Sequence, residues 1–248
     1  MAAANTKVEE VFNDFVLKIG GQLVASLLTG NNPPPNADYY FRDSGIIGEL
    51  KCLQVDSFSA NYAIKVQRIF DNWIQRRLLV VYGRVQVSLS QLNPICQKEW
   101  MDLIGNSLQK RFLEHANRQI KETKKTLQAD TAKGILFVSS DGNSSLQPYD
   151  LMFFLDRTLK KKKKDGSLLY SNIDGIVYFS WTMPGYHASI PQPILFWFGV
   201  PRDPNDIKTR EFMDRLESLW FEFLCTLTGQ RIPRLVQKGI KLQDIKIS

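Results

Sequence analysis

One short segment of the chain brings together Asp38, Glu49 and Lys51, and it predicts a β-hairpin whose turn lies at residues 42–45. Side chains alternate between the two faces of a strand, so Glu49 and Lys51 share a face. Two carboxylates can hold a divalent cation, and a neighbouring ammonium can contact a phosphate or the attacking water. These residue types at this spacing therefore predict a site that cleaves phosphodiester bonds.

The same Glu-x-Lys triplet has a simpler interpretation, a solvated ion pair on an exposed strand. Such pairs are common and contribute little stability. The flanking residues Ile46, Ile47, Leu50 and Leu53 instead predict an internal strand. Buried charges are costly unless they are paired or bound to a metal, so this context favours the functional interpretation.

Composition bounds the class of protein. The 248 residues are 44% hydrophobic, enough for a real core, and we expect a single domain over residues 1–248. The 32 basic and 25 acidic residues give a net charge of +7, which suits a polyanionic partner. Three widely spaced cysteines favour a reducing compartment over a disulfide framework. No signal peptide or apolar run of membrane-spanning length is found, so we expect a cytoplasmic protein without a membrane partner.

Hydrophobic periodicity predicts helices and strands in alternation after the hairpin. Helices are expected at 6–28, 57–79, 95–128 (in two pieces that meet near Gly105), 148–159 and from Asp203 to Thr228, with Asp203 as N-cap and Gly229 as the stop. Strands are expected at 85–89, 134–139, 173–181, 194–200, where a run without charges suggests cover on both faces, and 239–248. This pattern predicts an α/β protein with a mixed sheet flanked by helices, a mostly helical insertion at about 90–130 and a C-terminal strand–helix extension.

Three groups of basic residues are candidate phosphate contacts. They are Lys65, Arg68 and Arg76 on the helix after the hairpin; Lys110, Arg111, Arg118, Lys121, Lys124 and Lys125 on the next helix; and the lysine run 160–164. An ordinary solvated face explains the first group equally well and is the default interpretation of the second. For the lysine run, a solvated loop is favoured over a phosphate contact or a nuclear-import signal.

Residues 6–80 resemble the PD-(D/E)XK phosphodiesterase superfamily, the restriction-endonuclease-like fold. That family is built on a helix, a hairpin or meander carrying Asp and Glu-x-Lys, a further helix and a further strand. The resemblance implies that Asp38, Glu49 and the Leu50 backbone carbonyl bind metal, while Lys51 lies beside the scissile phosphate. It also implies a carboxylate from the first helix, for which Glu10 is the first choice and Glu9 the alternate.

The activity implied by this resemblance is a Mg²⁺-dependent endonuclease acting on DNA, with Mn²⁺ as a substitute, in restriction, phage defence or repair. A homodimer or a protein partner is compatible with it. The alternative is a catalytically silent module of the same fold that binds nucleic acid or protein. The chain departs from the family where Asn36-Ala37 replaces a frequent proline, and where Asp71 follows Gln67 at the place of a tyrosine found in some branches.

Overall fold

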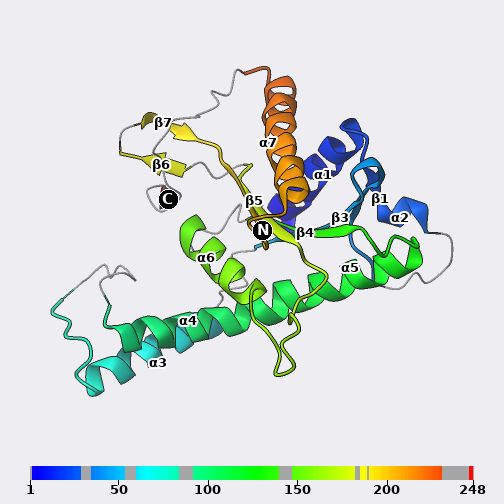
Figure 1. The fold of residues 1–248 in the computed structure, drawn as a ribbon. Helices are drawn as coiled ribbons and strands as arrows, with labels where there is room; N and C mark the ends of the chain where they lie inside the picture. Colours follow the sequence, from blue (N-terminus) through cyan, green and yellow to red (C-terminus); the bar gives the residue numbers. More distant parts are fainter. Residues whose placement is uncertain are drawn as a thin grey trace.

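The computed structural model has a six-stranded mixed β-sheet with helices on both faces (Figure 1). It describes residues 2–28, 35–53, 60–83, 92–139, 147–181, 185–188, 190–230 and 246–247. The sheet order is β1 (Gln22–Leu23), β2 (Tyr39–Phe41), β3 (Ile46–Cys52), β4 (Lys133–Ser139), β5 (Gly175–Phe179) and β8 (Trp197–Pro201). The pairs β3–β4 and β4–β5 are parallel, and the other neighbours are antiparallel. The predicted mixed α/β sheet is thus confirmed.

The predicted hairpin is formed by β2 and β3. A single 3₁₀ turn, Arg42–Ser44, leads into Gly45, whose φ of 63° is the left-handed conformation that glycine adopts without strain. The register pairs Tyr39 with Gly48 and Phe41 with Ile46. Because β4 pairs with the other edge of β3, β3 is an internal strand, as its apolar sequence predicted.

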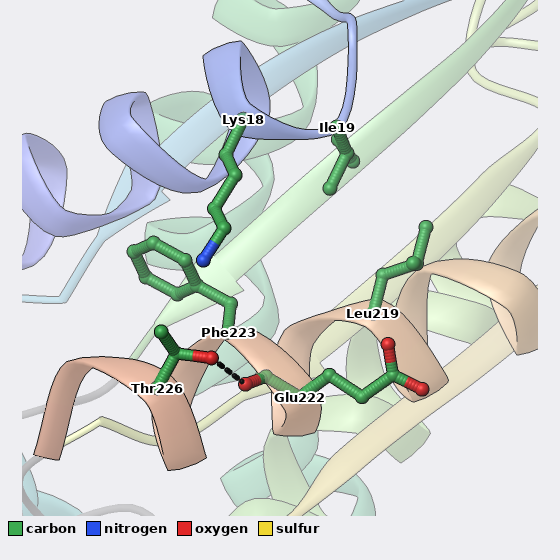
Figure 2. A pocket seen from close by; sticks show the side chains of 6 residues that line it. All are labelled: Lys18, Ile19, Leu219, Glu222, Phe223 and Thr226. Atoms are coloured by element: carbon green, nitrogen blue, oxygen red, sulfur yellow. Dashed lines mark hydrogen bonds between the residues drawn. The ribbon is translucent and has the colours of Figure 1, made fainter. Parts of the chain in front are cut away.

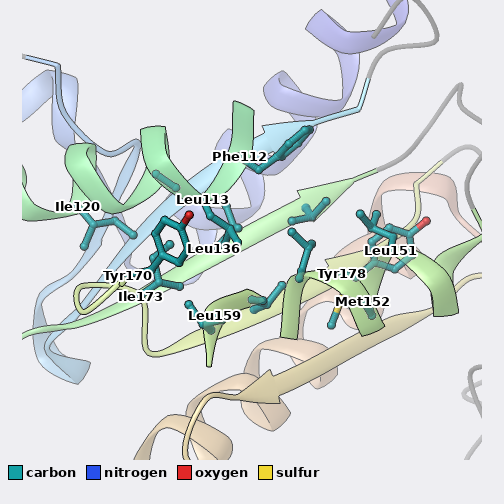
Figure 3. Packing of buried hydrophobic residues seen from close by; sticks show 14 of the residues in the cluster. Phe112, Leu113, Ile120, Leu136, Leu151, Met152, Leu159, Tyr170, Ile173 and Tyr178 are labelled. Carbon is teal, nitrogen blue, oxygen red and sulfur yellow. The ribbon is translucent and has the colours of Figure 1, made fainter. Parts of the chain in front are cut away.

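The two faces of the sheet carry separate cores. On one face, β3 and β4 contribute Ile47, Leu136 and Val138, which pack with α5 (His115–Thr126) and α6 (Pro148–Leu159). Figure 3 shows Leu136 in this core together with Ile120 of α5 and Leu159 of α6. On the other face, α1 (Ala2–Lys18) and α7 (Ile207–Thr228) form an aromatic-rich core around Phe12 and Trp220. Side chains alternate along β3, so Glu49 and Lys51 lie on the face that α5 and α6 cover.

A long helical rod connects β3 to β4. It consists of α4 (Pro94–Leu108), a π-helical turn (Gln109–Glu114) and α5, and in Figure 1 it projects past the sheet at its α4 end. There α3 (Ala60–Gln75) packs against α4 around the buried residues Trp73, Leu92 and Cys96. The rod changes geometry at the π-helical turn and not near Gly105, so the predicted position of the break was wrong.

Two further predicted boundaries were wrong near the N-terminus and the C-terminal helix. The first helix ends at Lys18 because Gly20 has a φ of +83°, and β1 and the short α2 (Val24–Leu27) occupy the rest of the predicted segment. The N-cap of α7 is Asp206, whose side chain accepts a 3.1 Å bond from the Thr209 amide, and not Asp203. Gly229 ends this helix as predicted.

The apolar run 194–200 is divided between two strands, so the prediction that it forms a single strand covered on both faces was also wrong. Its first residue ends β7 (Ile190–Ile194), which pairs with β6 (Gly185–His187) in a small sheet completed by β9 (Lys246–Ile247). The remainder forms β8 at the edge of the main sheet, where Gly199 is exposed. The predicted strand 85–89 and most of 239–248 lie outside the described residues.

Besides the hairpin, four predicted elements are confirmed in place: β4, α6 and, with shorter bounds, α3 and β5. The lysine run 160–164 lies in an exposed turn that follows α6, as predicted. In the part of the chain that the structure describes, no helix is both long enough and apolar enough to cross a bilayer.

Candidate active site

Asp38 is fixed beside the middle of β3. It directly precedes β2, and its amide donates a 3.1 Å hydrogen bond to the carbonyl of Gly48. Its carboxylate Oδ2 accepts a 2.7 Å bond from the amide of Leu50. The Asp38 side chain thus extends the hydrogen bonding between β2 and β3 beyond the first residue of β2, and this holds the Asp38 carboxylate next to Glu49.

Glu49 is a buried carboxylate, only 1% exposed. The ammonium of Lys51 contacts its Oε1 atom, which confirms that the two side chains share a face. The other oxygen, Oε2, is buried, and while both carboxylates are ionised it has no hydrogen-bond donor among the described residues. An ionised oxygen of this kind is costly to bury unless a proton or a cation neutralises it.

Burial, and after it the charge of Asp38, raise the pKa of Glu49 to about 8, while Lys51 opposes the shift. The pKa of Asp38 is raised chiefly by burial, against the opposing effects of the Leu50 amide and Lys51. When Glu49 is protonated, it shares that proton with Asp38. Two carboxylates buried side by side therefore favour a bound proton, and a divalent cation can take the place of that proton.

The oxygen donors around this proton suit a hard cation. Asp38 and Glu49 supply carboxylates, and the Leu50 carbonyl lies on the same edge of β3 as its amide, toward Asp38. The described residues contain no group of three His, Cys, Asp or Glu side chains placed to hold a metal. Mg²⁺ ordinarily uses one or two carboxylates and keeps several waters, so the donors present fit it.

Of the two helix carboxylates, the structure favours Glu9 over Glu10. The charge of Glu9 raises the pKa of Asp38 and of the adjacent Tyr39. The Tyr39 hydroxyl donates a 2.9 Å bond to Asn13, which fixes the rotation of α1. Glu9 and Glu10 lie four and three residues before Asn13, both near its face of the helix, and of the two it is Glu9 whose charge acts on Asp38 and Tyr39.

Two residues of α5 complete the site, and no sequence signal singled them out. Gln119 accepts a 3.1 Å bond from Lys51 Nζ and donates a 2.9 Å bond to the carbonyl of Asn36. Thr123 accepts a 2.7 Å bond from the amide of Ala37 and donates to the Gln119 carbonyl. Their four-residue spacing places both on one face of the helix, but this spacing identifies them as site residues only when it is known that α5 packs on β3.

The basic candidates on α3 lie apart from this site. Lys65 and Arg68 are exposed on a helix that packs on the projecting end of α4 (Figure 1), and Arg76 pairs with Glu99 at 2.7 Å. Any phosphate that they bind would belong to a part of the ligand remote from Lys51. On α5, Arg118, Lys121 and Lys125 are exposed; the side chains of Lys110 and Arg111 lie outside the described set.

A hollow of about 350 Å³ lies between α1 and α7, as Figure 2 shows. Its lining includes Lys18, whose ammonium lies over the ring of Phe223 at 5.4 Å, together with Ile19 and Leu219. Since α1 and α7 cover the opposite face of the sheet from Glu49, this hollow is not part of the carboxylate site.

Comparisons with known proteins add no identification. The chain matches no protein-family model, no curated protein and no solved structure.

Proposed function

We propose that this protein is a metal-dependent phosphodiesterase that cuts DNA internally. The proposal depends most on one observation: the buried Glu49 carboxylate, with its unsatisfied Oε2, lies beside Asp38 and next to the ammonium of Lys51. A stable fold has little reason to bury two carboxylates together unless they bind something positive. The net charge of +7 favours a polyanionic substrate.

The order of elements supports a relation to the PD-(D/E)XK superfamily. A helix (α1), a meander (β1, β2 and β3) carrying Asp38 and Glu49-x-Lys51, a helix (α5) and a parallel strand (β4) follow one another. The sequence resemblance calls for this order, but it took the helix expected at 57–79 as the one that follows the hairpin, whereas α5 is the helix that packs on β3. The long α3–α4 segment is inserted between the meander and α5, and β5, β8 and α7 extend the core.

In this proposal each polar group has one task. A bound Mg²⁺, or Mn²⁺ in its place, supplies a water of lowered pKa and neutralises charge on the phosphate. Asp38, oriented by the Leu50 amide, and Glu49 hold the cation, with Glu9 adding negative charge nearby. Lys51 binds a phosphate oxygen as a point charge, and Gln119 keeps its ammonium in place.

A cleavage assay tests this proposal. Plasmid, linear duplex and single-stranded DNA are incubated with Mg²⁺, with Mn²⁺ or with chelator. We expect metal-dependent cutting by the wild type and at least about a hundredfold loss in Glu49→Gln and Lys51→Ala. The matched control is Glu122→Gln, a more exposed carboxylate on α5 that pairs with Lys125. Normal cutting by both site variants would show that the site is wrongly assigned.

One observation favours the alternative, a silent module that binds nucleic acid or protein. Lys51 contacts Glu49 directly, so the two charges satisfy each other in part without any metal. The module predicts nucleic-acid binding that weakens with salt, without turnover in any metal. Metal titration separates the two functions, because a silent site leaves the thermal stability of the protein unchanged when Mg²⁺ or Mn²⁺ is added.

A further inference from the structure

Two aromatic rings are exposed side by side on the outer face of α6. Tyr149 and Phe153 are 39% and 43% exposed, their centroids are 6.1 Å apart, and their planes differ by 22°. The opposite face of the same helix is buried in the core with Leu151, Leu155 and Leu159. The rings are thus additional to the apolar surface that α6 needs for folding, and each is partly exposed to solvent.

Positive charge continues the line of these rings. Arg157 follows Phe153 by four residues on the same helix face and is exposed, and the exposed lysines 160–164 follow at the helix end. Residues 149–165 contain six basic and three acidic side chains. Of the acids, Asp156 pairs with Lys160 at 2.7 Å and Asp165 accepts hydrogen bonds from Ser167, and the segment as a whole keeps a net charge of +3.

We propose that this surface, which we define as Tyr149, Phe153, Arg157 and lysines 160–164, binds single-stranded nucleic acid. Bases stack on the two rings, and the phosphates contact the arginine and the lysines. Aromatic platforms beside basic side chains are the general means of holding a single strand, because every base has a stackable face. A duplex hides those faces, and an apolar protein partner would gain nothing from six neighbouring cations.

The surface and the carboxylate site lie on the same side of the sheet. The helix α6 packs with α5 on the face toward which Glu49 and Lys51 point. In the parallel pairing of β3 with β4, Lys51 lies opposite Val138, near the end of β4, and α6 is the next helix along the chain. The inference rests on the proposed function only for the chemical class of the ligand. A nucleic-acid strand bound on α6 would extend across the face of the sheet where cleavage is proposed.

Binding is measured without cleavage, in chelator, by the fluorescence anisotropy of a labelled oligothymidine. We expect Tyr149→Ala combined with Phe153→Ala to weaken binding at least about fivefold, equal to about 1 kcal/mol. The control is Tyr186→Ala, which removes a ring of similar exposure, 44%, from β6. Unchanged circular dichroism and melting temperature show that both variants fold, since all three rings are exposed.

The charge contribution is tested separately. Lys161→Glu with Lys163→Glu is expected to weaken binding about tenfold at moderate salt and to lower the salt dependence, whereas Lys208→Glu, on α7, changes binding less. Three results would overturn the inference: no binding by the wild type, equal binding by the ring variant, or preference for a duplex of the same length. Normal stacking-dependent binding without metal-dependent cutting would instead overturn only the proposed nuclease function.

Discussion

Lys51 Nζ lies 3.1 Å from Gln119 Oε1, although 68 residues separate the two in the chain. The other end of the same amide donates to the Asn36 carbonyl, so Gln119 connects β3 to the segment that leads into Asp38. A lysine at a reacting phosphate must be held within a few tenths of an ångström, which a flexible four-carbon chain does not achieve alone. Gln119 is therefore a positioning residue for Lys51.

Gln119→Ala is expected to lower the rate of DNA cleavage by about 10- to 100-fold, the usual effect of removing a supporting hydrogen bond near a metal site. The loss should appear in kcat with KM little changed, because bulk DNA binding does not pass through this amide. The control is Gln67→Ala, whose exposed amide bonds only Asp71 within α3. Equal rates for the two variants would show that Gln119 does not position Lys51.

Glu49→Gln is expected to raise the free energy of unfolding at alkaline pH. Burial is the main cause that lifts the Glu49 pKa to about 8 from its ordinary value of 4.5, so the folded state binds more protons than the unfolded state between these values. Wild-type stability must then fall as pH rises from about 4.5 to 8, by on the order of 5 kcal/mol. Glutamine carries no such penalty, so urea unfolding should show a difference that grows from pH 5 to pH 8.

The control for this pH effect is Glu122→Gln, since Glu122 is more exposed and pairs with Lys125 at the surface. Its stability difference from wild type should be small at every pH. A Glu49→Gln difference that stays constant from pH 5 to pH 8 would contradict the raised pKa. The same series run with Mg²⁺ should show a smaller alkaline difference, because the cation neutralises the wild-type carboxylates.

The local part of the site was predictable from sequence. Turn residues at 42–45 and the alternation around Glu49 and Lys51 determine the hairpin and the shared face, because both depend on near neighbours. Gln119 and Thr123 were not predictable, since their role comes from packing α5 on β3 across an insertion. Whether Glu9 or Glu10 lies nearer to Asp38 depends on how α1 packs beside β2, which the sequence does not show.

The same limit explains the errors in the second half of the fold. An apolar run does not show where one strand ends and the next begins. Residues 194–200 were therefore predicted as one strand, whereas they contain the end of β7 and most of β8. Asp203 and Asp206 are both good caps by type; the structure selects Asp206, which bonds both Thr209 and Lys133. Helix and strand type follow from periodicity, whereas boundaries follow from contacts.

Divalent-metal affinity is expected to rise with pH between about 6 and 8. Glu49 must release its proton before its carboxylate can bind Mg²⁺, so the apparent affinity should increase up to about tenfold per pH unit below its pKa of about 8. Calorimetry in two buffers of different ionisation enthalpy measures the proton released on binding. Glu49→Gln should bind weakly and release no proton. Metal affinity that is flat with pH would show that the metal does not use Glu49.

Asp174→Ala is expected to destabilise the fold by about 3–5 kcal/mol, because it leaves a half-buried guanidinium without its charge partner. Asp174 accepts a 2.9 Å bond from the Gly134 amide and a 2.7 Å bond from Arg202, which joins the starts of β4 and β5 to the end of β8. The comparison is Lys125→Ala, which removes an ion pair at the surface and should lower the free energy of unfolding by about 0.5 kcal/mol or less. Chemical denaturation of both variants measures the difference, and equal costs would refute this role.

Gly134→Ala and Gly105→Ala are expected to change stability in opposite directions. A Cβ on Gly134 would lie 1.9 Å from the carbonyl oxygen of Asn172 and 2.9 Å from Ile120, so the backbone before β5 must move at a cost of about 2 kcal/mol or more. A Cβ on Gly105 meets no described atom within 4 Å, and alanine should stabilise α4 by about 0.5–1 kcal/mol. Urea unfolding of the two variants at one pH measures both. Since Ile120 lies one residue from Gln119, Gly134→Ala should also lower cleavage by displacing α5, whereas Gly105→Ala should leave the rate unchanged.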